Sequence, residues 1–371
     1  MKPTRARPLT IVADDLTGAC DTGALFAVRA LVPVSIWPRR AAADATVRVV
    51  DTESRTLSGP DAAERVATVA AGGRARHWFK KIDSTLRGPV GAEVDALMRA
   101  TGVTTAIVCP AFPAQRRVVL NRALLVAGTP VAATPIARDP TFPAGSGSSV
   151  VDILRPQLDR ALAWIPLDQV RAGAEALAAR VRRLAGTAII ADGETDADLD
   201  ALVEAALAVT PQPLLVGSAG LGRALAARLG LLGERVELPA GARWLLVAGS
   251  AHPTARRQVK EARVAGITVL ATPERAVADR AEVLPRLVEQ AVAAIERERW
   301  DLVIVTGGET AVALLSALGA DRMEVAGAPA PGLALGHVRL AGREPQAILT
   351  KAGGFGPPDL FVSLQKKEVV A

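Results

Sequence analysis

Two adjacent carboxylates near the N-terminus are the first residues whose types and spacing could do chemistry. Asp14 and Asp15 follow a short apolar run at 9–13, and helical spacing begins soon after them. This order predicts a strand, a tight turn and a helix. In an open α/β sheet, ligands bind at the carboxyl ends of the strands, where paired carboxylates suit a metal ion, a sugar hydroxyl or proton transfer. The alternative is that both residues cap the helix and decorate its loop.

A second polar group, 80–89, follows the apolar segment 77–79 and is expected at the end of another strand. It holds three cations, one carboxylate and two hydroxyls within the eight residues KKIDSTLR. Arg87 could grip a substrate carboxylate through two parallel hydrogen bonds, while Asp83 and Ser84 could hold hydroxyls. The alternative is a solvated loop with salt bridges of its own, as is usual for charge runs.

A third polar loop and several glycine turns follow later strands. In the loop CPAFPAQRR, Arg116 or Arg117 could face a ligand, although loops bounded by proline are common. The turns at 216–218, 248–250 and 306–308 each end an apolar run ahead of a helical stretch. Such turns place backbone N–H groups at a helix N-terminus, which suits phosphate, but ordinary α/β turns share the pattern.

The sequence KAGGFG near the C-terminus follows an apolar run at 348–350. Its glycines let a phosphate chain approach the backbone, and Lys351 beside them suits contact with polyphosphate or adenine. The sequence G-x-x-x-x-G-K-[ST] is absent, and GSAGLG at 217–222 has the wrong spacing for G-x-G-x-x-G. A P-loop protein and a dinucleotide-dependent dehydrogenase are therefore disfavoured.

The elements that must position these residues alternate between short apolar runs and helical stretches. This alternation predicts an α/β fold with mostly parallel sheets covered by helices. Helices are expected at 172–184, 199–208 and 221–229. Strands are expected at 9–13, 47–51, 78–82, 106–109, 189–192, 214–217, 244–248, 267–270, 302–306 and 348–350.

The chain of 371 residues is too long for one typical core, which predicts two domains. The clearest break is 233–241, where Pro239 lies between glycines and a new strand follows. The domains are accordingly expected at 1–235 and 240–371. The segment 139–149 is expected to be a long loop inside the first domain, because strand–helix alternation resumes after it.

Composition and charge argue against several classes of protein. Half of the residues are hydrophobic and 22% are charged, as in globular proteins, and 3% aromatic residues leave little for stacking on nucleic acid. The net charge of +6 is explained first by arginines scattered on solvated helix faces, and it could also favour an anionic substrate. No DNA- or RNA-binding pattern is found. No apolar stretch approaches the roughly 20 residues of a membrane span. Two cysteines without CxxC spacing and three scattered histidines favour a cytoplasmic protein without a zinc site.

The ordered motifs of the chain resemble those of the four-carbon acid sugar kinase family, from residue 11 to about 360. These motifs are DDLTGACDTG, KKIDSTLRGP, CPAFPAQRR, ARDPTFP, GSAGLG, AGSAHPTA, VTGGETA and TKAGGFG. The resemblance implies two Rossmann-like α/β domains, the first binding a four-carbon sugar acid and the second ATP, with the active site in the cleft between them. The residues expected to contact the sugar acid are Asp14, Asp15, Lys81, Asp83, Ser84 and Arg87, to which the third loop adds Arg117. Those expected to contact ATP are Ser250, Gly307, Gly308, Glu309, Thr310, Gly353 and Gly354.

The implied reaction moves the γ-phosphate of ATP to the terminal C4 hydroxyl of an acid such as D-threonate or D-erythronate, with Mg²⁺ bridging the phosphates. Asp15 or Asp83 is expected to be the catalytic residue that orients this hydroxyl and accepts its proton, and Arg87 with Lys81 to hold the carboxylate. Metal ligands are not assigned. A 3-oxo-tetronate kinase, a non-catalytic sugar-acid sensor and a metal-dependent isomerase or aldolase are the alternatives. The motifs determine neither the stereoisomer nor the oligomeric state, although homodimers are common among such enzymes.

Two positions in the third loop depart from the family pattern. Where that pattern has a glycine before the arginine, this chain has Arg116, and where a glycine follows some residues later it has Arg122. Arginine in place of glycine predicts a different path for this loop.

Overall fold

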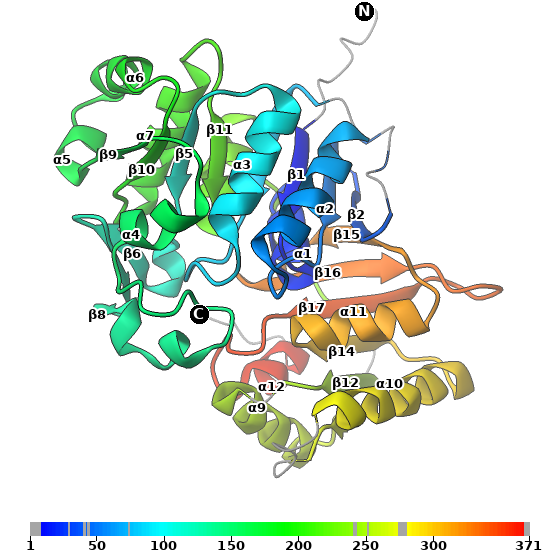
Figure 1. The fold of residues 1–371 in the computed structure, drawn as a ribbon. Helices are drawn as coiled ribbons and strands as arrows, with labels where there is room; N and C mark the ends of the chain where they lie inside the picture. The colour runs from blue at the N-terminus through cyan, green and yellow to red at the C-terminus, as the bar shows by residue number, and fades with distance from the viewer. Residues whose placement is uncertain are drawn as a thin grey trace, which may run out of the picture.

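The computed structural model describes residues 9–366 except 29, 40, 41, 43, 44, 73, 74, 240–242, 251 and 274–279. In this described part, strands and helices alternate along most of the chain (Figure 1). The strands form one continuous 14-stranded sheet and one small three-stranded sheet. The order in the large sheet is β13-β12-β14-β17-β16-β15-β2-β3-β1-β4-β11-β5-β10-β9.

The N-terminal half supplies a run of parallel strands and the helices that cover them. The strands are β1 (Leu9–Ala13), β2 (Val32–Ile36), β3 (Val47–Asp51), β4 (His77–Lys81), β5 (Ala106–Cys109), β9 (Leu162–Ile165), β10 (Ala188–Ala191) and β11 (Leu214–Gly217). The helices are α1 (Leu16–Ala24), α2 (Gly59–Ala71), α3 (Val90–Thr101), α4 (Val150–Leu154), α5 (Leu167–Val170), α6 (Ala174–Arg183), α7 (Asp196–Leu207) and α8 (Ala219–Arg228). The small antiparallel sheet is β6 (Arg117–Leu120), β7 (Ala123–Val126) and β8 (Thr129–Pro130), and four 3₁₀ turns are η1 (Pro113–Gln115), η2 (Val131–Ala133), η3 (Pro135–Arg138) and η4 (Arg155–Gln157).

The C-terminal half, yellow-green to red in Figure 1, has its own parallel strands. These are β12 (Trp244–Ala248), β13 (Thr268–Ala271), β14 (Leu302–Thr306) and β17 (Gln346–Lys351). The antiparallel strands β15 (Arg322–Gly327) and β16 (Leu333–Val338) connect them to β2 of the first half. The helices are α9 (Pro253–Val264), α10 (Arg280–Arg297), α11 (Gly308–Ala317) and α12 (Leu360–Gln365).

The predicted α/β fold with mostly parallel strands is confirmed. Six expected strands match their observed bounds, three are displaced by one residue (78–82, 189–192 and 267–270), and 348–350 lies within β17. The three expected helices are confirmed with ends shifted by one to three residues, and 139–149 is a long loop between η3 and α4. The antiparallel strands β15 and β16, which join the strands of both halves into one sheet, were not predicted from the sequence. Pro33 in β2 and Gly336 in β16 weaken the strand pattern there.

The segment expected to link the two domains lies against the strands that join the halves. The backbone N–H of Val236 donates to the carbonyl of Ala328 at 3.2 Å, and Arg235 pairs with Ala328 in an isolated bridge. Residues 240 and 241 of the expected linker, and the terminal residues 1–8 and 367–371 of the two expected domains, lie outside the described residues. The domain division stays a prediction.

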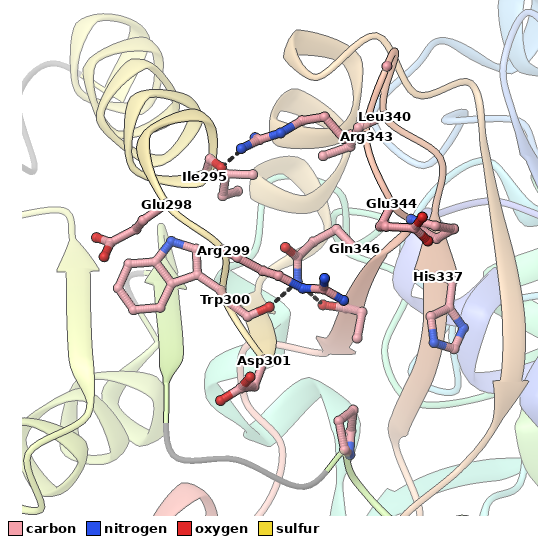
Figure 2. A pocket seen from close by; sticks show the side chains of 14 residues that line it. Ile295, Glu298, Arg299, Trp300, Asp301, His337, Leu340, Arg343, Glu344 and Gln346 are labelled. Atoms are coloured by element: carbon pink, nitrogen blue, oxygen red, sulfur yellow. Dashed lines mark hydrogen bonds between the residues drawn. The ribbon is translucent and has the colours of Figure 1, made fainter.

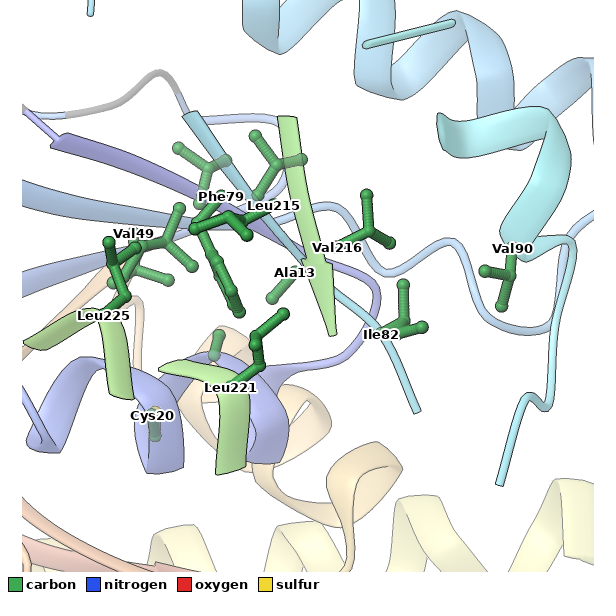
Figure 3. Close-up of a cluster of buried hydrophobic side chains, with 14 of the residues drawn as sticks. Ala13, Cys20, Val49, Phe79, Ile82, Val90, Leu215, Val216, Leu221 and Leu225 are labelled. Atoms are coloured by element: carbon green, nitrogen blue, oxygen red, sulfur yellow. The ribbon is translucent and has the colours of Figure 1, made fainter. Parts of the chain in front are cut away.

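Apolar side chains fill the space between the sheet and its helices. Phe79 of β4 and Leu215 of β11 lie beside Leu221 and Leu225 of α8, and all four are at most 1% exposed (Figure 3). Because helices cover both faces, the parallel strands are continuous apolar runs rather than alternating ones. Within the described residues, no helix combines the length and apolar character needed to cross a membrane.

Helix α1 lies where the two halves meet. It contacts β1, β2 and β3 of the first half and β15, β16, β17 and α11 of the second. Its small residues allow this close packing: a Cβ added at Gly23 would lie 3.3 Å from both Val34 and Val49. The N-terminus of α1, which carries Asp15, is thereby fixed between the halves.

Candidate active site

The strand register brings the polar motifs of the N-terminal half to one edge of the sheet. Ala13 at the end of β1 pairs with Asp51 of β3 and with Lys81 of β4. The segments that follow these strands, including Asp14 and Asp83, therefore start side by side at the carboxyl edge.

Arg55 connects the carboxylates at this edge. Its Nε donates to Asp14 Oδ2 at 2.7 Å, and its Nη2 donates to Asp15 Oδ1 at 2.6 Å and lies 4.0 Å from Asp83 Oδ1. Burial alone would lower the pKa of Arg55, but the charges of Asp14 and Asp15 hold it well above its ordinary value. The sequence motifs do not include Arg55. Its position just after a strand beside that of Asp14 was the available signal.

Asp15 is the N-cap of α1, so the capping interpretation is correct for it. Its Oδ1 accepts from the Gly18 N–H at 3.1 Å, and its Oδ2 accepts from the Thr17 hydroxyl at 2.5 Å. A Cβ added at Gly18 would lie 2.6 Å from Lys81 Nζ, which puts that ammonium group next to the cap. Burial raises the pKa of Asp15, but Arg55 and Lys81 outweigh it and the net pKa is lowered. Asp15 is therefore ionised at neutral pH, with the Arg55 and Lys81 cations beside it.

Asp14 is the more buried of the two adjacent carboxylates, Asp14 and Asp15. It is 1% exposed, and its Oδ1 has no hydrogen-bond partner among the described residues. A buried acceptor without a partner is costly, so this oxygen is a candidate contact for a ligand hydroxyl.

Asp83 and Arg87 form an ion pair with each other, so neither charge is left unpaired for a ligand. Arg87 donates to both Asp83 oxygens at 2.9 Å and to Asp139 Oδ2 at 3.1 Å. Burial raises the pKa of Asp83, but the Arg87 and Arg55 charges hold it well below its ordinary value. The solvated-loop alternative was right about the salt bridges. The geometry does not support the expected grip of Arg87 on a substrate carboxylate.

Arg117 is a cation of this edge that, unlike Arg55 and Arg87, is not paired with a carboxylate among the described residues. Its Nη1 donates to Ser84 Oγ at 2.5 Å, so the second and third polar loops do meet. Within the part of the chain that the structure describes, Arg117 makes no ion pair, and its buried Nε has no hydrogen-bond partner. Burial lowers its pKa and the charge of Asp83 offsets part of that effect.

The third loop keeps a backbone that suits glycine, although arginines stand in it. Arg116 has φ +54° and Arg122 has φ +69°, both in the left-handed region. The Arg122 guanidinium stacks on the Trp164 ring at 4.9 Å, and the backbone N–H of Arg122 donates to Asp192 Oδ1 at 3.0 Å. These backbone angles do not support the predicted change of path.

Three glycine turns pack together at the carboxyl edge of the C-terminal half, where Ala248, Thr306 and Lys351 are in register. A Cβ added at Gly249 would lie 2.1 Å from Thr310 Oγ1, and one at Gly353 would lie 2.3 Å from Ser250 Oγ. Only glycine fits at such distances. The expected residues Ser250, Gly307, Thr310 and Gly353 are therefore brought to one place, with Gly354 beside His252 Nε2.

The N-terminus of α11 has the features of an anion site. Gly307 is its N-cap with φ +104° and makes no side-chain cap. The Gly307 N–H donates to the Lys351 carbonyl at 3.0 Å, and the N–H groups of Gly308 and Thr310 lie in the first turn of the helix, where no intrahelical carbonyl is available to them. They add to the positive end of the helix dipole.

The similar turn at 216–218 is structural. Ser218, 1% exposed, caps α8 by accepting from the Gly220 N–H at 3.1 Å, and its hydroxyl donates to the Ala111 carbonyl at 2.6 Å. Two of the donors that could hold a phosphate, the Gly220 N–H and the Ser218 hydroxyl, are therefore already used there.

The two edges meet at Asp15. A Cβ added at Gly308 would lie 3.4 Å from Asp15 Oδ2 and 3.7 Å from Thr17 Oγ1. In addition, Asp21 Oδ1 of α1 accepts from the Gly332 N–H of the second half at 3.1 Å. The N-terminus of α11 therefore faces the carboxylates of the first half.

Lys351 is not available to a ligand, contrary to the interpretation of its sequence motif. Its side chain is 0% exposed, and its Nζ donates to the carbonyls of Ala352, Gly353 and Phe355 at 2.6, 3.1 and 2.9 Å. It lies beneath the turn rather than on it.

A pocket of about 550 Å³ lies elsewhere, at the amino ends of β14 and β17 (Figure 2). Trp300 and Asp301 precede β14 in its wall, and Gln346 begins β17. It is thus at the opposite end of these strands from Thr306 and Lys351. No group of three or more His, Cys, Asp or Glu among the described residues could hold a metal ion.

Comparison with known proteins agrees with this arrangement. A model described as a sugar-binding N-terminal domain matches residues 9–225, and one described as a nucleotide-binding C-terminal domain matches 287–361. A D-threonate kinase of Salmonella typhimurium is 31% identical, over 94% of this chain and 95% of that protein. A 3-oxo-tetronate kinase of Burkholderia multivorans is 28% identical over 97% of each chain.

Solved structures share the fold. A Salmonella typhimurium protein superposes with a TM-score of 0.81 at 18% identity, covering 98% of this chain and all of that one. A Bordetella bronchiseptica protein, described as a domain-swapped dimer with bound citrate, is 28% identical with a TM-score of 0.51 over 98% of this chain and all of that one. With the matched domains and relatives, these observations show that the chain belongs to the four-carbon acid sugar kinase family.

Proposed function

We propose that the chain transfers the γ-phosphate of ATP to the C4 hydroxyl of a four-carbon sugar acid of the D-threonate or D-erythronate type. The observation that carries this proposal is the approach of Gly308 to Asp15, which sets the N-terminus of α11 against an ionised carboxylate. Phosphoryl transfer needs positioning and charge stabilisation more than covalent chemistry, and this junction offers both.

Arg117 holds the substrate carboxylate in this proposal. Arg55 and Arg87 are already paired with carboxylates of the chain, whereas among the described residues the side chain of Arg117 has the Ser84 hydroxyl and no carboxylate as its partner. A guanidinium binds a carboxylate through two donors, which fixes the orientation of the acid. Ser84 and Asp14 Oδ1 are placed to contact the substrate hydroxyls.

Asp15 orients the reacting hydroxyl, and Lys81 stabilises the charge that develops on the transferred group. Of the two candidate catalytic carboxylates, Asp15 lies at the junction beside Gly308, whereas Asp83 forms its ion pair with Arg87 inside the first half. An ionised Asp15 accepts a hydrogen bond from the hydroxyl, and later its proton. Asp83 serves to fix Arg87 and the loop that carries Ser84.

The nucleotide phosphates contact the N–H groups of Gly308, Glu309 and Thr310, with Ser250 and the turn of Gly353 and Gly354 on the other side. Mg²⁺ binds largely through phosphates and water and needs few protein ligands, which is compatible with the finding that no group of three or more His, Cys, Asp or Glu among the described residues could hold a metal ion. Glu309 in the first turn of α11 is the carboxylate that would hold it, and the ion would neutralise phosphate charge.

A homodimer is part of the proposal, because the Bordetella bronchiseptica relative, 28% identical, is described as a domain-swapped dimer. Light scattering on the purified chain tests this, with a dimer mass expected.

A coupled ADP-release assay tests the function. MgATP is offered with D- and L-threonate, D- and L-erythronate, the 2- and 3-oxo-tetronates, and the neutral polyols threitol and erythritol. We expect turnover on one tetronate and little on the polyols. Turnover on 3-oxo-tetronate alone would favour that alternative, while binding of an acid without ADP release would favour a sensor and contradict the kinase.

Arg117→Met sharpens the assignment of the carboxylate contact. Loss of a charge-assisted hydrogen bond costs about 1.5–3 kcal/mol, so the preference for the tetronate over the matching polyol in kcat/KM should fall about 10- to 100-fold. Arg116→Met, next to it on the exposed side of the loop, should leave the preference within twofold. An unchanged preference in Arg117→Met would reject this contact.

A further inference from the structure

We propose that Lys351 is the positioning residue of the nucleotide site: its buried ammonium group fixes the turn 352–355 and supplies a positive charge behind the bound phosphates. This inference rests on the proposed function, since it takes the glycine turns as the place where the phosphates bind.

Lys351 connects both turns of that site. Its Nζ donates to three carbonyls of 352–355, the turn that carries Gly353 and Gly354. Its own carbonyl accepts from the Gly307 N–H at 3.0 Å, which anchors the start of α11. One residue thereby sets the separation between the N-terminal N–H groups of α11 and the diglycine turn.

The charge of Lys351 lacks an anionic partner. In the described residues no carboxylate lies within ion-pair distance of its Nζ, whereas the other fully buried lysine, Lys80, has Glu93 Oε2 at 3.3 Å. Carbonyl oxygens satisfy the three donors but not the charge. A phosphate bound above the turn is the missing anion.

The surroundings of Lys351 couple its protonation to that anion. Burial lowers the pKa of Lys351 to about 7. On β14 it is opposite Thr306, and from α9 it is faced by the neutral Gln258, which donates to the carbonyl of Phe355 at 2.8 Å. The titratable neighbour is His252, whose own pKa is lowered by partial burial and by the charges of Lys351 and Arg87.

Phosphate binding is therefore expected to raise the pKa of Lys351 and to take up a proton. At pH 8 a lysine with a pKa near 7 is mostly neutral, so the uptake on binding should be about half to one proton. Ionisation of a nucleotide phosphate on binding would release protons, which has the opposite sign. His252 is too weak a base to contribute at this pH.

Calorimetry of MgADP binding to the full chain at pH 8, in buffers of different ionisation enthalpy, measures this uptake. We expect proton uptake in the wild type and in His252→Gln. In Lys351→Met the uptake should vanish and the affinity should fall at least tenfold. Lys80→Met removes an equally buried lysine under the other edge, and it should keep the affinity for MgADP within about threefold.

Absence of proton uptake in the wild type, or a Lys351→Met variant that binds MgADP as tightly as the wild type, would overturn the inference. If that variant does not fold, the wild-type and His252→Gln measurements decide alone. Failure of the wild type to bind MgADP at all would reject the nucleotide site and this inference together. Normal MgADP binding without proton uptake would reject only the role of Lys351.

Discussion

The two edges that meet at Asp15 differ in the chemical groups that line them. The edge of the N-terminal half is a network of side-chain charges in which Arg55 and Arg87 tie together Asp14, Asp15 and Asp83. The edge of the C-terminal half is made of glycine turns and backbone N–H groups, with its lysine buried beneath them. Side chains can distinguish a carboxylate from hydroxyls, whereas backbone N–H groups can donate to the oxygens of any phosphate.

The contrast extends to the two buried lysines. Lys80 is paired with Glu93, which also accepts from the Ser54 hydroxyl, so this buried lysine has its counter-ion without a ligand. Lys351 has no such carboxylate among the described residues. In the proposed function, the first edge therefore orients a small acid through its paired side chains, and the second edge is completed by the phosphates of the nucleotide.

The largest effect is expected from Asp15→Asn, at the junction of the two edges. Loss of the acceptor for the C4 hydroxyl should lower kcat by about 10²- to 10⁴-fold. Because Asp15 does not hold the phosphates, the Kd for MgADP should change less than threefold. Steady-state kinetics and calorimetry check this.

Asp83→Asn provides the matched comparison, since it removes a carboxylate that binds Arg87 rather than the reacting group. It should raise the KM of the acid more than it lowers kcat. Equal loss of kcat in both variants, or loss in neither, would contradict the assignment of Asp15.

The next effect concerns the charge balance beneath the first edge. Glu93→Gln keeps the shape of the side chain but leaves the Lys80 ammonium buried without its anion. Breaking a buried pair in this way should lower the free energy of unfolding by about 3 kcal/mol in urea titrations. In Lys80→Met/Glu93→Leu, which removes both charges, part of that loss should be recovered. A cost below about 1 kcal/mol would mean that the first edge does not depend on this pair.

A smaller effect is expected at the contact that joins the halves through Asp21. Burial raises the pKa of Asp21 to about 6, above its ordinary value of 3.8. A raised pKa means that this carboxyl favours the fold when protonated, and that this stability is lost as the pH rises from about 4 through 6. A side-chain amide at this position cannot ionise and can still accept from the Gly332 N–H, so Asp21→Asn avoids the loss.

Asp21→Asn should therefore be more stable than the wild type by about 1 kcal/mol at pH 8, after allowance for the partial exposure of the side chain, and equal to it at pH 4. Urea titrations at both pH values measure the difference. A variant that is less stable than the wild type at pH 8 would show that the charged form of Asp21 stabilises the junction.

Much of this site could be predicted from sequence because its residues follow strands. Asp14, Asp15 and Ser84 were expected at the carboxyl edge from apolar runs alone, and the glycine turns from the same signal. Arg55 was missed because it stands alone after β3, without a motif around it.

Two other features needed the three-dimensional structure. A run such as KKIDSTLR does not show which cations are paired inside the chain. Arg87 was therefore expected to bind a substrate carboxylate, whereas it donates to Asp83 and Asp139. The depth of a residue below its own turn is likewise invisible in a linear motif, so Lys351 was expected to contact polyphosphate or adenine, whereas its side chain is buried beneath the turn. Both errors arise because pairing and burial depend on contacts between distant segments.

A crystal structure of the chain with MgADP and the tetronate that it phosphorylates would test the central division between the two edges most directly. We predict that the phosphates lie on the N–H groups of Gly308 to Thr310 and beside Gly353, that the carboxylate of the acid lies on Arg117, and that its C4 hydroxyl lies on Asp15. Phosphates bound among Arg55, Arg87 and Arg117, with the glycine turns free of them, would contradict this account.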